Sequence, residues 1–309
     1  MHKLTPSTIL LTVLFALECS GQEVSQDISW KAGPRLPHAS EYQTFGVHGE
    51  VIYLAGGTNA DPGLAFDTGT ETWIEIPGLP VLRDFSAGAV VNDFFYVCGG
   101  IDETHGATRS VEMLDIRQQK WSSAPPMHDI RSRFPAVACN GKLYVFGGLD
   151  VDPDGNYGNL ASAESYDPAI GRWQGIAPMS VARHGHAATV LGDAIYVAGG
   201  YTDTGQTGLL ERYDPVENAW TTLAPMPTPR GFHGLVAVRG QLFAIAGRIY
   251  AGPAAVEAYD PDQHSWHSLS PLDGRLNRFA AAVIGDKIYV IGGEEDPDGV
   301  RIGTLGAKR

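Results

Sequence analysis

Six tryptophans divide this chain of 309 residues into units of similar length. They are Trp30, Trp73, Trp121, Trp173, Trp220 and Trp266. Counting 26 residues forward from each Trp reaches a Gly-Gly pair in every unit except the fifth, which has Ala246-Gly247. The pairs are Gly56-Gly57, Gly99-Gly100, Gly147-Gly148, Gly199-Gly200 and Gly292-Gly293. Because this spacing is the same in six copies, it indicates an internal structural repeat whose units pack against their neighbours.

Each unit has the pattern of four short antiparallel strands, here named A to D. A short apolar run with an aromatic residue inside it, such as Leu143-Tyr144-Val145, precedes each glycine pair and predicts strand B. A turn such as Asn140-Gly141 lies upstream and suits a two-residue hairpin between strands A and B. Strand C ends in an Asp six residues before the Trp of strand D, at Asp67, Asp115, Asp167, Asp214 and Asp260. A Glu stands three residues before that Asp in four units, at Glu112, Glu164, Glu211 and Glu257.

This combination resembles the Kelch repeat, whose pattern is Gly-Gly, then Glu-x-Tyr-Asp, then Trp. Gly199-Gly200, Glu211-Arg212-Tyr213-Asp214 and Trp220 carry the resemblance most closely, and it covers residues 28 to about 305. The departures from the pattern are Ala246 for Gly, Leu64 for Glu, and Phe66 and Leu114 for Tyr. The resemblance implies an all-β fold, a six-bladed β-propeller in which each unit is a blade.

The two ends of the repeat are complementary halves of one blade. The first Trp has no strand C before it, and the last glycine pair has no Trp after it. We therefore expect residues 28–32 to supply strand D to a sixth blade with strands A and B near 280–293 and strand C at 300–305. Closure leaves no free sheet edge, which predicts one domain over residues 22–309 and a monomer.

Residues 1–21 have the three parts of a secretory signal peptide. A basic start is followed by an apolar run from Ile9 to Leu17, which is too short to span a bilayer, and by small residues at Cys19 and Gly21. Cleavage after Gly21 predicts a secreted or periplasmic protein with no membrane span in the mature chain. The alternative is a lipoprotein carrying its lipid on Cys19, but Glu18 stands where such a site expects a small residue.

The charge argues against a nucleic-acid-binding protein, and the cysteine content argues against a protein stabilised by disulfides. The formal net charge is −13, and an acidic chain repels the phosphate backbone of DNA or RNA, so we expect no nucleic-acid binding. After signal removal only Cys98 and Cys139 remain, both in apolar strand-like runs. Two cysteines do not form a disulfide framework, and we interpret them as buried thiols.

Length variation points to one face of the propeller as the binding face. From the second glycine to Asp the copies have 10, 15, 19, 14 and 13 residues, whereas the A–B and C–D turns keep their lengths. Variable loops on a rigid scaffold tend to carry binding residues. The B–C and D–A loops share one end of an antiparallel meander, so we expect the ligand there.

The D–A loops repeat an arginine ten residues after the Trp. These arginines are Arg83, Arg131, Arg183 and Arg230, with Arg275 and Arg278 nearby in the sixth copy. One interpretation is a ring of guanidinium groups that binds carboxylates or phosphates at the channel mouth. The other is a structural role, capping a loop or pairing with acidic side chains. His184 stands outside the repeat register and is a further ligand candidate, whereas His186 and His233 share one register position and suggest a structural hydrogen bond.

The longest B–C loop contains Asp150, Asp152 and Asp154, followed by Gly155. Alternating carboxylates closed by glycine can hold a hard cation such as Ca²⁺, although Ala161 stands where an EF-hand loop has its Glu. The alternative is an acidic turn without metal. We therefore expect no cofactor and retain Ca²⁺ as a possibility at this loop.

Two functions follow from the resemblance, because Kelch propellers are mostly interaction scaffolds and propellers also host catalysis. The first is an exported binding module for a protein segment or a glycan on the B–C and D–A face. The second is a sugar-acid epimerase or mutarotase, since exported Kelch proteins include sialic acid epimerases that use an Arg and a carboxylate. Glu103 and Glu294 in B–C loops are candidate acids, but no residue can be assigned as catalytic from the sequence, so enzymatic activity stays open.

Overall fold

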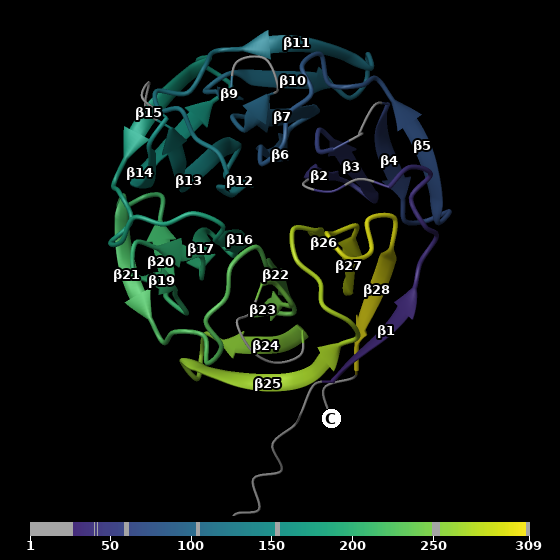
Figure 1. The fold of residues 1–309 in the computed structure, drawn as a ribbon, viewed down its shortest axis with the longest axis vertical. Coiled ribbons are helices and arrows are strands. Elements are labelled where there is room, and N and C mark those ends of the chain that lie inside the picture. Colours follow the sequence, from purple (N-terminus) through teal and green to yellow (C-terminus); the bar gives the residue numbers. More distant parts are fainter. Residues whose placement is uncertain are drawn as a thin grey trace, which may run out of the picture.

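The computed structural model describes residues 27–39, 41, 43–58, 62–102, 106–151, 155–248 and 254–306. Six four-stranded antiparallel sheets stand around a central axis, as Figure 1 shows. Strand A of each sheet lies nearest the axis and strand D, which carries the Trp, lies at the outside. The prediction of an all-β, six-bladed propeller is therefore confirmed.

The blades follow the repeat. Blade 1 contains β2 (Thr44–His48), β3 (Val51–Ala55), β4 (Gly63–Asp67) and β5 (Thr72–Ile76). Blade 2 contains β6 (Ala87–Val91), β7 (Phe94–Cys98), β10 (Val111–Asp115) and β11 (Lys120–Ala124). Blade 3 contains β12 (Ala136–Cys139), β13 (Lys142–Val151), β14 (Tyr157–Asp167) and β15 (Arg172–Ile176). Blade 4 contains β16 (Ala187–Leu191), β17 (Ala194–Ala198), β20 (Leu210–Asp214) and β21 (Ala219–Leu223). Blade 5 contains β22 (Gly234–Val238), β23 (Gln241–Ile245), β24 (Ala254–Asp260) and β25 (Ser265–Leu272).

Blade 6 is built from both ends of the repeat region. Its strands are β26 (Ala280–Ile284), β27 (Lys287–Ile291), β28 (Val300–Leu305) and β1 (Ile28–Ala32). β1 pairs antiparallel with β28, with Ile28 opposite Leu305 and Ala32 opposite Arg301. The predicted closure, including the short strand C, is confirmed, and the first and last blades are thereby joined.

Five of the six tryptophans link their blade to the preceding one by a hydrogen bond. The indole Nε1 of Trp73, Trp121, Trp173, Trp220 and Trp266 donates to the carbonyl oxygen of the fourth residue after the previous Trp, at 2.8–3.0 Å. The Asp that ends strand C caps the C–D turn: Asp214 Oδ1, for example, accepts from the amides of Val216 and Glu217. Apolar clusters fill the space between blades, as where Phe146 of blade 3 packs with Val197 of blade 4. The Trp and the Asp thus recur in the repeat because the Trp joins neighbouring blades and the Asp caps the C–D turn.

The glycine pair is required where neighbouring blades meet. Gly199 has φ +67°, and a Cβ there would lie 2.5 Å from the carbonyl oxygen of Arg230 in the next blade. Gly200 has φ +102°, and its Cβ would lie 2.7 Å from the carbonyl oxygen of His184 in its own blade. Both positions therefore combine left-handed backbone with a close backbone approach, which favours glycine, although Ala246 occupies the first position in blade 5 with φ +48°.

We expect Gly199→Ala to destabilise the fold by about 1–3 kcal/mol more than Gly192→Ala, because a crowded site adds overpacking to backbone strain. Gly192, at an A–B turn, has a similar φ of +61° but no atom within 4 Å of its added Cβ. Denaturant unfolding of both variants measures the difference. Equal losses of unfolding free energy in the two variants would show that backbone strain alone accounts for the need for glycine at position 199.

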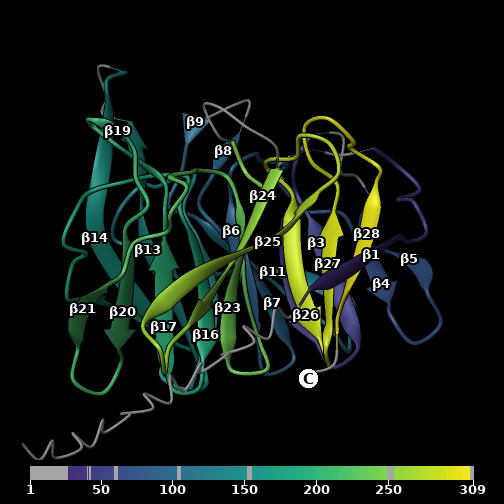
Figure 2. The ribbon, with the colours of Figure 1, turned by 90° about the horizontal axis from the view of Figure 1, so that it is seen from below.

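The two faces of the propeller differ as expected. The B–C extensions, including β8 (Ile101–Asp102), β9 (Gly106–Ala107), β18 (Tyr201–Thr202) and β19 (Gly205–Gln206), rise on one face, and the short A–B and C–D turns lie on the other (Figure 2). β13 and β14 extend as one long hairpin on the same face as the other B–C loops. No helix long and apolar enough to cross a membrane occurs in the described part of the chain.

Candidate functional site

The four repeated arginines lie inside the blades. The side chains of Arg131, Arg183 and Arg230 have no exposed surface, and Arg83 is 3% exposed as a residue. Each of the first three forms an ion pair at 2.7 Å with the Glu of strand C in its own blade, and the pairs are Arg131–Glu164, Arg183–Glu211 and Arg230–Glu257. Arg83 donates to Ser110 Oγ at 2.6 Å, and the charge of Glu112 acts on it.

These arginines join the D–A loop to the glycine pair. Arg131 Nη1 donates to the carbonyl oxygen of Gly147 in its own blade at 2.7 Å. Its backbone carbonyl accepts from Gly100 N of the preceding blade at 2.9 Å. The structure thus corrects the expectation that Arg83, Arg131, Arg183 and Arg230 ring the channel mouth. Three of them, Arg131, Arg183 and Arg230, pair with strand-C glutamates. Arg83 instead donates to Ser110, and the charges of Glu112 and Asp102 act on it.

Burial lowers the pKa of Arg83, Arg183 and Arg230, and the neighbouring glutamates oppose that shift. Guanidinium stays protonated even in such surroundings, so each pair remains ionic. A buried charge whose partner is removed is strongly destabilising. The Arg-Glu pair is therefore part of the scaffold.

The remaining candidates are half-buried or exposed. Arg275 is exposed in the loop before blade 6, and Arg278 lines a cavity on the axis. His184 is half-buried, stacks on Tyr201 with ring centroids 5.4 Å apart, and its Nδ1 lies 2.7 Å from Asn159 Oδ1. Burial and the charge of Arg133 lower the pKa of His184 to about 4, so the imidazole is neutral at pH 7.

The channel mouth is formed by the residues twelve positions after each Trp, and of these sequence reasoning named only Arg278. In five blades they are Phe85, Arg133, Gly185, Phe232 and Arg278, and all five have φ between +52° and +62°. Their backbones form a belt from blade to blade. Arg133 N donates to Phe85 O, Gly185 N to Arg133 O, Phe232 N to Gly185 O and Arg278 N to Phe232 O, at 2.7–3.0 Å. Tyr42 has the same register position and lies outside the described residues.

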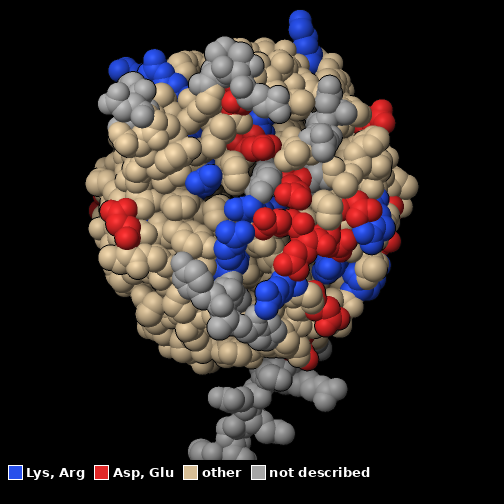
Figure 3. Space-filling model, viewed as in Figure 1, with Lys and Arg blue, Asp and Glu red and all other residues tan. Residues whose placement is uncertain are grey.

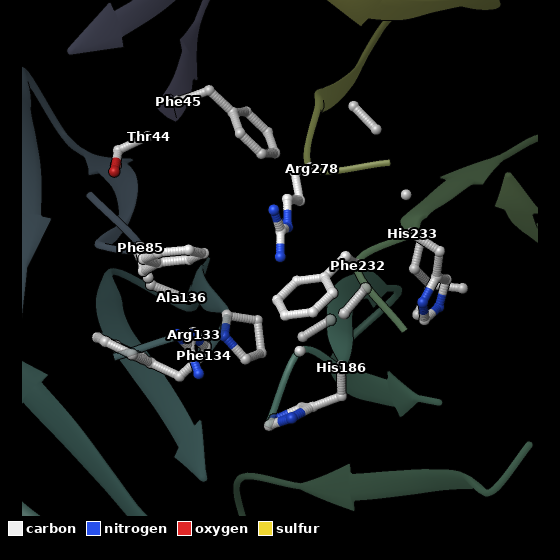
Figure 4. A pocket seen from close by; sticks show the side chains of 18 of the residues that line it. Thr44, Phe45, Phe85, Arg133, Phe134, Ala136, His186, Phe232, His233 and Arg278 are labelled. Carbon is white, nitrogen blue, oxygen red and sulfur yellow. The ribbon is translucent and has the colours of Figure 1, made fainter. Parts of the chain in front are cut away.

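The side chains of this ring meet over the axis. The Cζ of Arg133 lies 4.6 Å from the ring centroid of Phe85, and the Cζ of Arg278 lies 4.9 Å from that of Phe232 and 5.7 Å from that of Phe85. Gly185 has no side chain, and the Phe232 ring lies over it, 3.1 Å from the position of a Cβ. Figure 4 shows Phe85, Phe232 and Arg278 pointing toward one another. Guanidinium groups that stack on aromatic faces keep their N–H donors directed outward in the plane.

A cavity of about 170 Å³ begins at this ring and is lined by all six blades. Its lining segments begin at Gln43, Phe85, Arg133, Gly185, Phe232 and Arg278. Small side chains of strand A, such as Ala136 and Ala187, line its deeper part. The mouth thus combines aromatic faces and arginines above a small apolar channel, a composition typical of binding sites.

His186 makes the structural hydrogen bond that the shared register suggested, whereas neither ring nitrogen of His233 has a hydrogen-bond partner among the described residues. His186 Nε2 lies 3.0 Å from the carbonyl oxygen of Phe146 in blade 3. A Cβ on Gly199 would touch His233 Cε1, so this imidazole packs against the neighbouring blade. Burial lowers the pKa of His233 to about 3, and that of His186 also lies well below its usual value. Both imidazole rings are therefore neutral and pack between neighbouring blades.

Of the three acidic residues proposed as Ca²⁺ ligands, only Asp150 lies within the described residues. Asp150 Oδ1 accepts from the amide of Val151, while Asp152 and Asp154 lie outside the described residues, as do Glu103 and Cys19. No group of three metal-binding side chains occurs among the residues that are described. The expectations of no cofactor and of a possible Ca²⁺ site both stay predictions. Cys98 and Cys139 are buried free thiols, as predicted.

Charges are distributed unevenly over the face formed by the B–C and D–A loops. In Figure 3, Lys and Arg side chains lie near its centre and Asp and Glu side chains gather beside them. Arg278 Nη1 lies 3.1 Å from Glu294 Oε1, and Arg248 Nη2 lies 3.4 Å from Glu294 Oε2. One of the acids proposed from the sequence, Glu294, thus meets the channel-mouth ring at Arg278.

Known proteins share this architecture. A solved structure titled "Structure of YjhT" superimposes with a TM-score of 0.77 over 88% of this chain and 96% of that one, at 17% sequence identity, which concerns the fold alone. The chain is 35% identical to human Kelch-like protein 33 over 44% of its length and 32% identical to mouse Kelch-like protein 35 over 52%. It spans only 26% and 27% of the length of those two relatives. Residues 86–293 match the family described as the KLHDC2/KLHL20/DRC7 Kelch-repeats domain. The chain belongs to the Kelch-repeat family.

Proposed function

We propose that this protein is an exported Kelch propeller that binds a protein segment or a glycan on the face formed by the B–C and D–A loops. The observation that carries the proposal is the channel-mouth ring, in which Phe85, Arg133, Phe232 and Arg278 converge over the axis. Aromatic and arginine side chains supply most of the binding energy in protein interfaces. The family supports the proposal, because Kelch propellers mostly serve as interaction modules.

The geometry of the ring favours recognition over a purely structural role. Structural positions in this chain are the same in nearly every blade, as the Trp and the glycine pair are. The ring position instead differs between blades, and it is held rigidly by the backbone belt. A site that recognises an asymmetric ligand needs different side chains around the axis, and a rigid backbone lowers the entropy lost on binding.

A second candidate function is a mutarotase or epimerase that acts on a sugar acid. It is favoured by the contact between Arg278 and Glu294 at the mouth, because an arginine can hold the sugar carboxylate while a carboxylate transfers protons. Under this proposal Glu294 would act as the acid and base at the anomeric centre. Arg278 would orient the substrate.

One NMR experiment separates the two functions. N-acetylneuraminate is added to the purified protein, and both its line broadening and its rate of anomer exchange are followed. Broadening without faster exchange is expected for the binding module, and faster exchange would establish the enzyme. If neither occurs, the sugar-acid proposal fails, and a screen of glycans and peptides against the intact protein then tests the binding proposal.

A further inference from the structure

We propose that Glu294 occupies the anion position of the channel-mouth site and that a ligand carboxylate displaces it. The inference rests on the proposed binding function. It assigns to Glu294 a role in specificity: this side chain limits the affinity of the site for anions, so that only a ligand with further contacts at the mouth can bind well.

The first step in the argument is the position of Glu294. Its backbone amide donates to the carbonyl oxygen of Asn277 at 3.1 Å, which places the residue beside Arg278. Its side chain is 33% exposed, so the carboxylate faces both the mouth and solvent. An incoming ligand can therefore reach the same guanidinium groups.

The second step is the geometry of the contacts. Glu294 divides its two oxygens between two guanidinium groups, Oε1 toward Arg278 at 3.1 Å and Oε2 toward Arg248 at 3.4 Å. A carboxylate that meets one guanidinium with both oxygens makes shorter, stronger and more directional hydrogen bonds. The pair with Arg248, whose side chain is 46% exposed, lies close to solvent, and such pairs contribute little to stability, so this contact can be exchanged at small cost.

The third step is that the side chain of Arg278 and the backbone of Arg248 are held by groups other than Glu294. Arg278 is held by its stacking between Phe85 and Phe232, and its backbone belongs to the belt. The backbone of Arg248 pairs with Gly231, and its carbonyl oxygen accepts from Gln206 Nε2 at 2.6 Å. The position of the anion is therefore determined by groups other than Glu294. A carboxylate from an acidic peptide or from a sugar acid fits it equally in chemical terms.

The test compares wild type with Glu294→Gln and a matched control, Glu295→Gln. Glu295 is exposed and differs from its neighbour in having no ion pair among the described residues. The probes are N-acetylneuraminate with its neutral methyl ester, and an acetylated, amidated peptide containing Asp with its Asn counterpart. Affinities are measured by ligand-observed NMR, and the two carboxylate probes distinguish a sugar source from a peptide source.

We expect Glu294→Gln to raise the affinity for at least one carboxylate probe about two- to fivefold, the range that loss of one exposed ion pair gives. The neutral probes and the Glu295→Gln variant should show no change. Equal affinity of wild type and Glu294→Gln for both carboxylates, or no binding by either protein, would overturn the inference. If Phe232→Ala abolishes binding that Glu294→Gln leaves unchanged, the mouth remains the ligand site and only the role of Glu294 is lost.

Discussion

Replacement of Glu211 with alanine is expected to lower the free energy of unfolding by about 3–5 kcal/mol, the range found when one partner of a buried ion pair is removed. Both Arg183 and Glu211 have side chains with no exposed surface, and their charged atoms lie 2.7 Å apart. The variant leaves a guanidinium without its counter-charge inside blade 4. Glu211 Oε1 also accepts from the amide of Ser180, so the D–A loop loses its cap. Equilibrium unfolding in denaturant measures the loss.

A double variant tests the cause of this loss. Arg183→Met with Glu211→Leu replaces both charges by apolar side chains, and such replacements are often neutral or stabilising. We expect the double variant to recover most of the stability that Glu211→Ala loses. A loss below about 1 kcal/mol for Glu211→Ala would contradict a structural role for the pair, because that is the size expected of an exposed pair.

Trp173→Ala is expected to lower the free energy of unfolding by about 3–5 kcal/mol, because it removes a buried aromatic side chain. Trp173 is 3% exposed, and its Nε1 donates to the carbonyl oxygen of Pro125 at 2.8 Å, so the variant loses both packing and a link between blades 2 and 3. Thermal unfolding followed by calorimetry measures the change in Tm.

Two controls accompany this variant. Arg275→Ala removes an exposed rim arginine and should leave Tm nearly unchanged. Trp30→Ala removes the same indole from a half-buried position where Nε1 has no hydrogen-bond partner among the described residues, and it should cost less. Equal melting temperatures for Trp173→Ala and Arg275→Ala would contradict the assignment of the tryptophans to blade packing.

The fold could be predicted from the sequence because each repeated residue has a local or neighbouring-blade role. The constant distance from Trp to the glycine pair reflects contacts such as that of Gly199 with Arg230 O, and Gly56, Gly99 and Gly147 make the equivalent contact. The closure by β1 could be predicted as well, since two incomplete units remained at the ends. Even the predicted turns at Asn140 and Gly192 have the positive φ that two-residue hairpins require.

The candidate site could be predicted only in part. The face with the variable loops and Arg278 at the channel mouth were named from the sequence, but the recurrence of Arg at one register position drew attention to Arg131 and Arg183, which are buried. Recurrence indicates a role in the scaffold, because every blade has the same neighbours. The position twelve residues after each Trp differs from blade to blade, and that variation inside an otherwise constant register is the signal that could have found Phe85 and Phe232.

Other features of the site depend on tertiary structure alone. Arg248 and Glu294 share one register position, directly after the second glycine of their pairs, but the sequence does not show that their side chains meet across two blades. The stacking of Arg278 between Phe232 and Phe85 joins residues from blades on different sides of the axis. Such contacts arise only when the ring closes, so they could not be read from individual units.

The most direct test of the proposed site compares two double variants for binding of the same ligand, whichever glycan, peptide or protein the intact propeller retains in a screen. Phe85→Ala with Phe232→Ala changes the channel-mouth ring, whereas Arg183→Met with Glu211→Leu changes a repeated buried pair. We predict that the first variant loses about tenfold or more in affinity, as removal of interface aromatics does, while the second binds like wild type. Binding that survives the loss of both phenylalanines but disappears with Arg183 would contradict the assignment of the ligand site to the ring.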